Sequence, residues 1–271
     1  MRHYKELWTI LALAFAFFFI LSYFDGIAIG DSFELRSAGF VRALTDAPRK
    51  TAAADTTVLA AASDAPEAKA TFAPAPTDTT AQTILFIGDS MLDGLSPRMV
   101  DYCLQNGHKL ISFRWYSSST SKWGSPSSSL LSDLIAKHKP SYVFICLGAN
   151  ELFINNVDTK CGPAVDNILA DIGSTPYIWI GPPNWKPDTG INDLIARKTR
   201  PGTFFLSNGM SFERRKDGAH PTDPSAAMWL DSVMRWMPAH AAQPIRMDSP
   251  RKPLPAKAPG QISIRIRQPN E

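Results

Sequence analysis

The sequence predicts an α/β domain whose parallel sheet is covered by helices on both faces. Short apolar runs with strand character alternate with helical patterns between Thr83 and Met237. The run from Thr83 to Ile87 is continuously apolar, as is typical of a strand that is buried on both sides. Repeated strand–helix units of this kind form doubly wound sheets, which bind ligands at the carboxyl ends of their strands.

Five strands are expected, because each run is short and bounded by turn residues or helical patterns. They are residues 83–87, 109–113, 142–147, 177–180 and 203–206.

The helices between the strands are predicted from their start and stop residues. Ser96 and Pro97 favour a helix start and Asn106–Gly107 a stop, while Asp223 and Pro224 favour the start of the last helix, which runs to about residue 236. The remaining predicted helices are residues 130–138, 164–172 and 191–198.

The N-terminal segment predicts a membrane anchor. Residues 7–24 carry no charged side chain, and this length of helix spans roughly 27 Å, close to the thickness of a bilayer core. Arg2 and Lys5 precede the segment and Asp25 follows it, which favours a cytoplasmic N-terminus and an exported remainder. A cleaved signal peptide is the alternative interpretation.

Composition divides the chain into five parts. Residues 1–25 are the cytoplasmic N-terminus and anchor, 26–45 a membrane-proximal neck, and 46–82 a flexible linker rich in Ala, Thr and Pro. Residues 83–237 are the predicted α/β domain. Residues 238–271 are a basic tail rich in Pro, in which 262–266 alternate like a strand, although the neighbouring prolines favour disorder.

Charge and cysteine content exclude several classes of function. The formal net charge of +3 gives no reason to expect a nucleic-acid partner. Three scattered cysteines are too few for a zinc site. Cys146 is expected to be buried in a strand, and a bridge between Cys103 and Cys161 stays open.

Three distant segments carry the residues of an acyl-transfer site. Ser90 follows the first strand, Asn150 follows the third, and Asp217 precedes His220 by three residues. A serine hydroxyl needs a base within hydrogen-bond reach, and an aspartate can orient the imidazole that serves as that base. Taken singly, Ser90 and Asn150 are also compatible with capping a helix and a turn.

This pattern, Gly88-Asp89-Ser90 with Gly148-Ala149-Asn150 and Asp217-x-x-His220, resembles the SGNH (GDSL-type) hydrolases over residues 83–237. The resemblance implies a flavodoxin-like three-layer αβα sandwich with a five-stranded parallel sheet. It assigns Ser90, Asp217 and His220 to catalysis, with the Ser90 amide and the Asn150 side chain in the oxyanion hole.

One position departs from the family pattern. A glycine amide usually supplies a further oxyanion donor after the second strand, and here Ser121 takes the aligned position, with Gly124 as the alternative. A backbone donor needs no particular side chain, so Ser121 is the predicted third donor.

Asp89, Asn184 and Trp185 are the predicted substrate contacts. Asn184 and Trp185 end a Gly-Pro-Pro-Asn-Trp loop after the fourth strand, and flat aromatic faces suit sugar rings. A rigid surface turn is the alternative for this loop. His108 and the basic run at 214–216 are expected at the solvated surface.

The resemblance implies a serine esterase that acts on O-acyl, most simply O-acetyl, esters of an extracytoplasmic carbohydrate. The chain looks most like the membrane-anchored branch that partners membrane-bound O-acyltransferases, which makes O-acetyl transfer to an envelope polysaccharide the alternative. A non-catalytic carbohydrate-binding protein is the third hypothesis. No metal or organic cofactor is expected, and the predicted location is the inner (cytoplasmic) membrane with a periplasmic catalytic domain.

Overall fold

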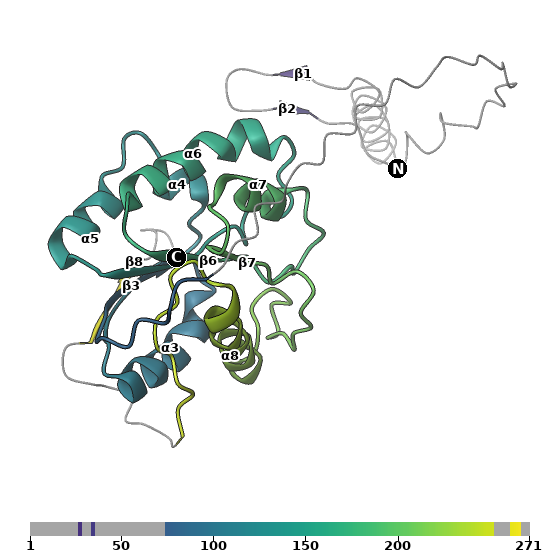
Figure 1. Cartoon of the computed structure of the whole chain (residues 1–271). Coiled ribbons are helices and arrows are strands. Elements are labelled where there is room, and N and C mark those ends of the chain that lie inside the picture. Colours follow the sequence, from purple (N-terminus) through teal and green to yellow (C-terminus); the bar gives the residue numbers. More distant parts are fainter. Residues whose placement is uncertain (1–26, 29–33, 36–73, 252–260, 267–271) are drawn as a thin grey trace, which may run out of the picture. The chain divides into compact units, whose positions relative to one another are not determined.

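The computed structural model describes residues 27–28, 34–35, 74–251 and 261–266 (Figure 1). The chain divides into two units, residues 1–67 and 68–271. In the first, β1 (Ile27–Ala28) pairs antiparallel with β2 (Glu34–Leu35). The predicted membrane span at 7–24 and most of the predicted linker lie outside the described residues. Among the residues that are described, no helix combines the length and the apolar character needed to cross a bilayer.

The second unit contains a parallel sheet, as predicted, but with six strands in its described part and not five. The strand order is β7-β6-β5-β3-β4-β8, and every neighbouring pair is parallel. The strands are β3 (Thr83–Gly88), β4 (Lys109–Trp115), β5 (Tyr142–Cys146), β6 (Tyr177–Ile180), β7 (Phe204–Phe205) and β8 (Ile262–Ile266). From β3 the chain adds β4 on one side and then returns to add β5 on the other side of β3. The point between β3 and β5 is therefore a topological switch point, where doubly wound sheets bind ligands.

The sixth strand corrects the prediction of a disordered tail. β8 adds to the free edge of β4, where Phe113 pairs with Ile264. Ile264 packs against the core, whereas Ile262 and Ile266 are exposed. No proline lies within residues 262–266, so each of these residues keeps the backbone N–H that the ladder needs.

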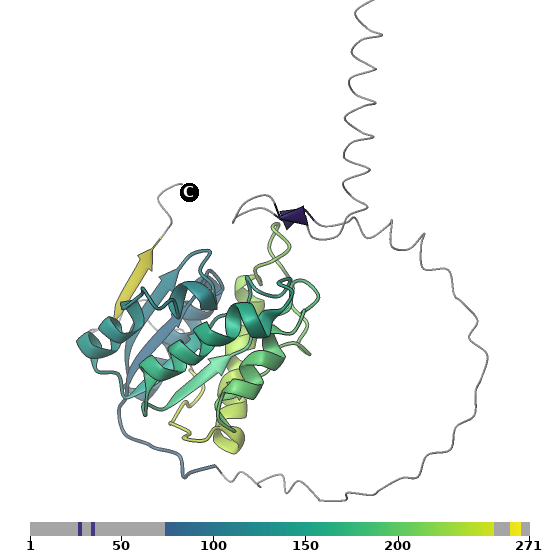
Figure 2. The same cartoon turned by 90° about the horizontal axis from the view of Figure 1, so that it is seen from above.

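Helices cover both faces of the sheet (Figures 1 and 2). Ile84 and Phe86 of β3 belong to one core and Leu85 and Ile87 to the other, as expected for side chains that alternate across a strand. The first core packs on α3 (Leu92–Asn106) and α8 (Asp223–His240). The second packs on α4 (Thr120–Trp123), α5 (Leu130–His138), α6 (Val157–Ile172) and α7 (Ile191–Lys198).

Two helices begin earlier than predicted, since their starts were expected at Ser96–Pro97 and at residue 164. α3 begins at Leu92 and contains Pro97, and α6 begins at Val157 and contains Pro163. Each proline removes one helical N–H donor. Burial of the preceding turns offsets this loss, since Leu92, Leu95 and Val157 all lie in the cores.

The cysteines are all buried and unpaired. Cys103 lies in the core under α3 and Cys161 in the core under α6, on opposite faces of the sheet. The open question of a Cys103–Cys161 bridge is therefore settled against it, while the expected burial of Cys146 is confirmed.

Candidate active site

Ser90 lies in the tight turn between β3 and α3. This turn needs the glycine before it, because a Cβ on Gly88 would lie 2.2 Å from the Leu92 side chain and 2.5 Å from the Cys146 carbonyl oxygen. The Asp89 amide donates to that carbonyl at 3.3 Å, and the Met91 amide donates to the Asp89 carboxylate at 2.9 Å. Ser90 is thereby held half-buried at the start of a helix, between two anchored residues.

His220 is presented by a hairpin-like loop before α8. The Arg215 amide donates to the His220 carbonyl at 2.8 Å, and the Thr222 amide to the Glu213 carbonyl at 2.8 Å. Gly218 turns the chain with a φ of 69°, in the region that favours glycine. The loop therefore has a defined backbone, although most of its residues are exposed.

The structure brings the three predicted catalytic residues together. His220 Nε2 lies 2.8 Å from Ser90 Oγ, and His220 Nδ1 lies 2.8 Å from Asp217 Oδ2. The imidazole thus lies within hydrogen-bond distance of a hydroxyl 130 residues earlier in the sequence and of a carboxylate three residues earlier. This is the geometry that a serine–histidine–aspartate site requires.

Asp217 is fixed by its own loop. Its Oδ1 accepts the Ala219 and His220 amides, each at 2.9 Å. These hydrogen bonds lower the pKa of Asp217 from its ordinary value of 3.8 to about 2. The carboxylate that faces His220 is therefore charged throughout the range in which an imidazole titrates.

Asn150 lies after β5, beyond Gly148, whose φ of 118° favours glycine. Its Nδ2 donates to the Ser118 carbonyl at 2.7 Å. A side-chain amide has two N–H groups, so this bond fixes the amide and leaves a second donor.

The predicted third oxyanion donor finds no support in these contacts. Ser121 lies in α4, is exposed, and directs its hydroxyl to the Lys160 carbonyl of α6 at 3.4 Å. No described contact joins it to Ser90 or Asn150, so its role stays a prediction. The alternative, Gly124, is committed elsewhere, because its amide donates to the Thr120 carbonyl at 2.8 Å and a Cβ there would meet the Ala164 carbonyl.

The expectation that Asp89 contacts substrate is wrong. Its side chain is fully buried and serves as an acceptor for the turn that carries Ser90. Burial, with a smaller contribution from the negative charge of Glu151, raises the pKa of Asp89 to about 7. A carboxylate that no solvent reaches cannot contact a ligand that arrives from solvent.

Glu151 is a second buried carboxylate that the sequence analysis missed. It is fully buried, and its Oε1 accepts the Thr120 amide. Burial raises its pKa as well. Asn150 and Glu151, successive in sequence, therefore hold the Ser118 carbonyl and the Thr120 amide of one turn. In the sequence, only its position directly after Asn150 indicated that Glu151 lies near the site.

Arg214, expected in a solvated basic turn, instead joins two loops of the site. Its guanidinium donates to the Ala219 carbonyl, and also to the Asn184 carbonyl at 3.0 Å and the Pro183 carbonyl at 3.3 Å. The loop of His220 is thereby attached to the Gly-Pro-Pro-Asn-Trp loop. The Asn184 side chain is partly used inside the protein, since its oxygen accepts from Asn192 at 3.0 Å.

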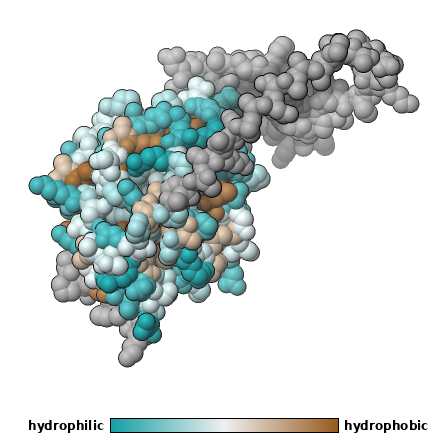
Figure 3. All heavy atoms as spheres, viewed as in Figure 1, coloured by the Kyte–Doolittle hydropathy of each residue, from teal (hydrophilic) through white to brown (hydrophobic). Residues whose placement is uncertain are grey.

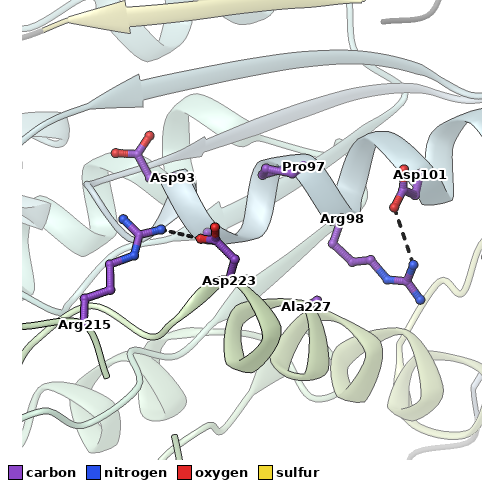
Figure 4. A pocket seen from close by; sticks show the side chains of 8 residues that line it. Asp93, Pro97, Arg98, Asp101, Arg215, Asp223 and Ala227 are labelled. Atoms are coloured by element: carbon purple, nitrogen blue, oxygen red, sulfur yellow. Dashed lines mark hydrogen bonds and ion pairs between the residues drawn. The ribbon is translucent and has the colours of Figure 1, made fainter. Parts of the chain in front are cut away.

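A groove of about 470 Å³ lies beside the site, between α3 and the start of α8. Figure 4 shows its mixed charge, with Arg215 paired to Asp223 and Arg98 to Asp101. Ser90 and His220 are not among the residues that line it. It is a polar neighbour of the site and is not the site itself.

No protein-family model and no curated protein sequence matches the chain. Among solved structures, TesA is 18% identical with a TM-score of 0.43, covering 57% of this chain and 97% of its own. The psychrotrophic esterase EstA from Pseudoalteromonas sp. is 17% identical with a TM-score of 0.42, covering 57% and 97%. The family 3 carbohydrate esterase of Clostridium thermocellum is 14% identical with a TM-score of 0.44, covering 58% and 94%. Likenesses this distant decide nothing about activity, so the chemistry rests on the geometry of the site.

Proposed function

We propose that this protein is a serine esterase of the SGNH type that cleaves an acyl ester through an acyl-serine intermediate. The observation that carries the proposal is the hydrogen-bonded chain from Ser90 through His220 to Asp217, with both distances at 2.8 Å. Ser90 lies 130 residues before His220 in the sequence, and no fold requirement brings its hydroxyl into line with the imidazole and carboxylate of the His220 loop.

The residues divide the reaction between them. His220 Nε2 accepts the Ser90 proton as Oγ attacks the ester carbonyl, and Asp217 stabilises the imidazolium that forms. The Ser90 amide, which donates to no other described residue, and the second N–H of Asn150 are the proposed donors to the oxyanion. His220 then returns its proton to the leaving alcohol, and water releases the acyl group.

An O-acetylated carbohydrate outside the cytoplasm is the proposed substrate, because the charge-free segment at 7–24 is a candidate anchor that would export the domain. Transfer of the acetyl group to a sugar hydroxyl, with a membrane-bound O-acyltransferase as donor partner, would use the same acyl-serine. Hydrolysis and transfer therefore differ only in whether water or a sugar hydroxyl accepts the acetyl group from Ser90, and the ratio of the two products measures this choice.

The test is intact mass after incubation with an aryl acetate, together with labelling by a fluorophosphonate. We expect an adduct of about 42 Da on Ser90, the mass of one acetyl group in place of a proton. Ser90→Ala should lose both the adduct and the labelling. Its turnover should fall by about a thousandfold or more. Ser132→Ala on the exposed face of α5 is the matched control and should behave as wild type. Turnover that survives Ser90→Ala would refute the proposal.

A further inference from the structure

Phe153 is a large apolar side chain that is left exposed beside the site. Its accessible fraction is 51%, and it lies three residues after Asn150 in the loop that follows β5. The face in Figure 3 is largely hydrophilic, with small separate apolar patches. A single exposed apolar residue needs no explanation, but this one is part of an ordered group.

The group is held by hydrogen bonds between two loops. Trp185 Nε1 donates to the Ala149 carbonyl at 2.9 Å, which fixes the indole against the Asn150 loop. The Thr189 amide and hydroxyl donate to the Leu152 and Ile154 carbonyls at 2.8 and 2.5 Å. The Phe153 and Trp185 rings meet edge to face, with centroids 6.0 Å apart. Rings fixed in this way bind a ligand with little further loss of side-chain entropy.

Lys186 adds a positive charge over these rings. Its ammonium lies 4.8 Å from the centroid of Trp185 and 5.0 Å from that of Phe153. It forms no ion pair with any residue in the described part of the chain, whereas Lys198 is paired with Asp166. We call Phe153, Trp185 and Lys186 the aromatic–lysine wall.

The wall lies on the rim of the sheet that carries the proposed nucleophile. Phe153 and Trp185 follow β5 and β6, and Ser90 follows β3, which pairs directly with β5 in parallel. The Trp185 loop is attached through Arg214 to the loop of His220. A chain-like ligand whose ester reaches Ser90 can therefore extend over the wall.

We infer that the aromatic–lysine wall binds a carboxylated sugar ring of the substrate chain, an inference that rests on the proposed esterase function. The C–H face of a sugar ring can pack on the exposed Phe153 ring and the open part of the half-buried Trp185 ring, and a carboxylate on that sugar supplies the anion that Lys186 lacks. The substrate class is thus an acylated acidic polysaccharide. A neutral sugar would leave the ammonium without an anionic partner, and an aliphatic acyl chain would have to lie against a positive charge.

The test measures binding of trigalacturonate, with maltotriose as the neutral chain of equal length, to the full-length protein. We expect tighter binding of trigalacturonate, with an affinity that falls as salt rises. Lys186→Gln should weaken that binding about tenfold and remove the preference over maltotriose. Phe153→Ala should weaken it by a similar factor. Lys137→Gln, an exposed lysine on α5, is the control and should leave the binding unchanged.

Equal affinity for the two trisaccharides, no binding of either, or an unchanged affinity in Lys186→Gln would overturn the inference. It would also be overturned if Phe153→Ala raised KM for p-nitrophenyl octanoate while trigalacturonate did not bind, because the wall would then serve an acyl chain. Hydrolysis of p-nitrophenyl acetate by the wild type reports on the proposed function alone. Absence of this hydrolysis would count against the esterase function, whereas the binding results count only for or against the aromatic–lysine wall.

Discussion

Two aspartates of the same site have pKa values shifted in opposite directions. Asp217 is about half exposed, accepts two backbone amides, and has a pKa lowered to about 2. Asp89 is fully buried next to Ser90 and has a pKa raised to about 7 by burial and by Glu151. The outer half of the site, around Asp217 and His220, thus depends on hydrogen bonds formed at the surface. The inner half, around Asp89 and Glu151, depends on burial.

The contrast shows that residue type does not decide the role of a carboxylate. Hydrogen bonds to the charged form keep Asp217 ionised, so it can stabilise a histidinium. Removal from water favours the neutral form of Asp89, and its Oδ1 accepts the Met91 amide of the Ser90 turn. Substitutions with the same chemistry should therefore have different consequences in the two halves.

The largest effect is expected in the outer half. Asp217→Asn removes the charge that faces His220 and should lower kcat/KM for an aryl acetate by about a thousandfold or more. Unfolding in urea should change little, because the side-chain oxygen of an asparagine can still accept the Ala219 and His220 amides. Asp133→Asn on α5 is the control for loss of an exposed carboxylate. Retention of more than a tenth of the activity in Asp217→Asn would mean that the two halves do not differ in the proposed way.

In the inner half, Asp89→Asn should change the pH dependence of stability. Because folding raises the pKa of Asp89, its contribution to stability is fully present below about pH 4 and is lost as pH rises through about 7. The asparagine variant does not titrate. Its free energy of unfolding should therefore vary less than that of the wild type between pH 4 and 7, by an amount on the order of a few kcal/mol.

Urea unfolding at pH 4, 5.5 and 7 measures this slope. Asp89 Oδ2 is buried without a hydrogen-bond partner among the described residues. An asparagine amide placed there would be a buried donor without an acceptor, so the absolute stability of Asp89→Asn should also fall. The slope, and not the absolute value, is the readout. Parallel curves for the wild type and Asp89→Asn would contradict a raised pKa.

The smallest effect on activity is expected from loss of Arg214, which attaches the His220 loop to the neighbouring loop. Arg214→Ala removes the hydrogen bonds that join the His220 loop to the Pro183–Asn184 backbone. We expect kcat to fall by about tenfold with little change in KM, because a looser loop lowers the fraction of correctly placed imidazole. Arg215→Ala, which breaks only an exposed ion pair with Asp223, is the matched control. Equal kinetics for the two variants would show that Arg214 does not position His220.

Most of the sheet could be predicted from local pattern. The five predicted runs occur at β3 to β7, because strands buried on both faces are rich in apolar side chains. The helix starts at Leu92 and Val157 could not be predicted, since the stabilising contacts of those turns come from distant parts of the chain. β8 was missed for the same reason, because an edge strand depends on the partner that it joins.

The sequence by itself determined which residues are proposed to carry the chemistry: Ser90 and Asn150 follow strands, and Asp217 lies three residues before His220 on one loop. Only the tertiary structure decided their surroundings. His108, expected at the surface, is buried between the Gln82 amide and the Arg246 carbonyl, at 3.0 and 2.7 Å. Strand and turn preferences act over a few residues, whereas burial, charge state and the contacts of Arg214 depend on segments that meet only after folding.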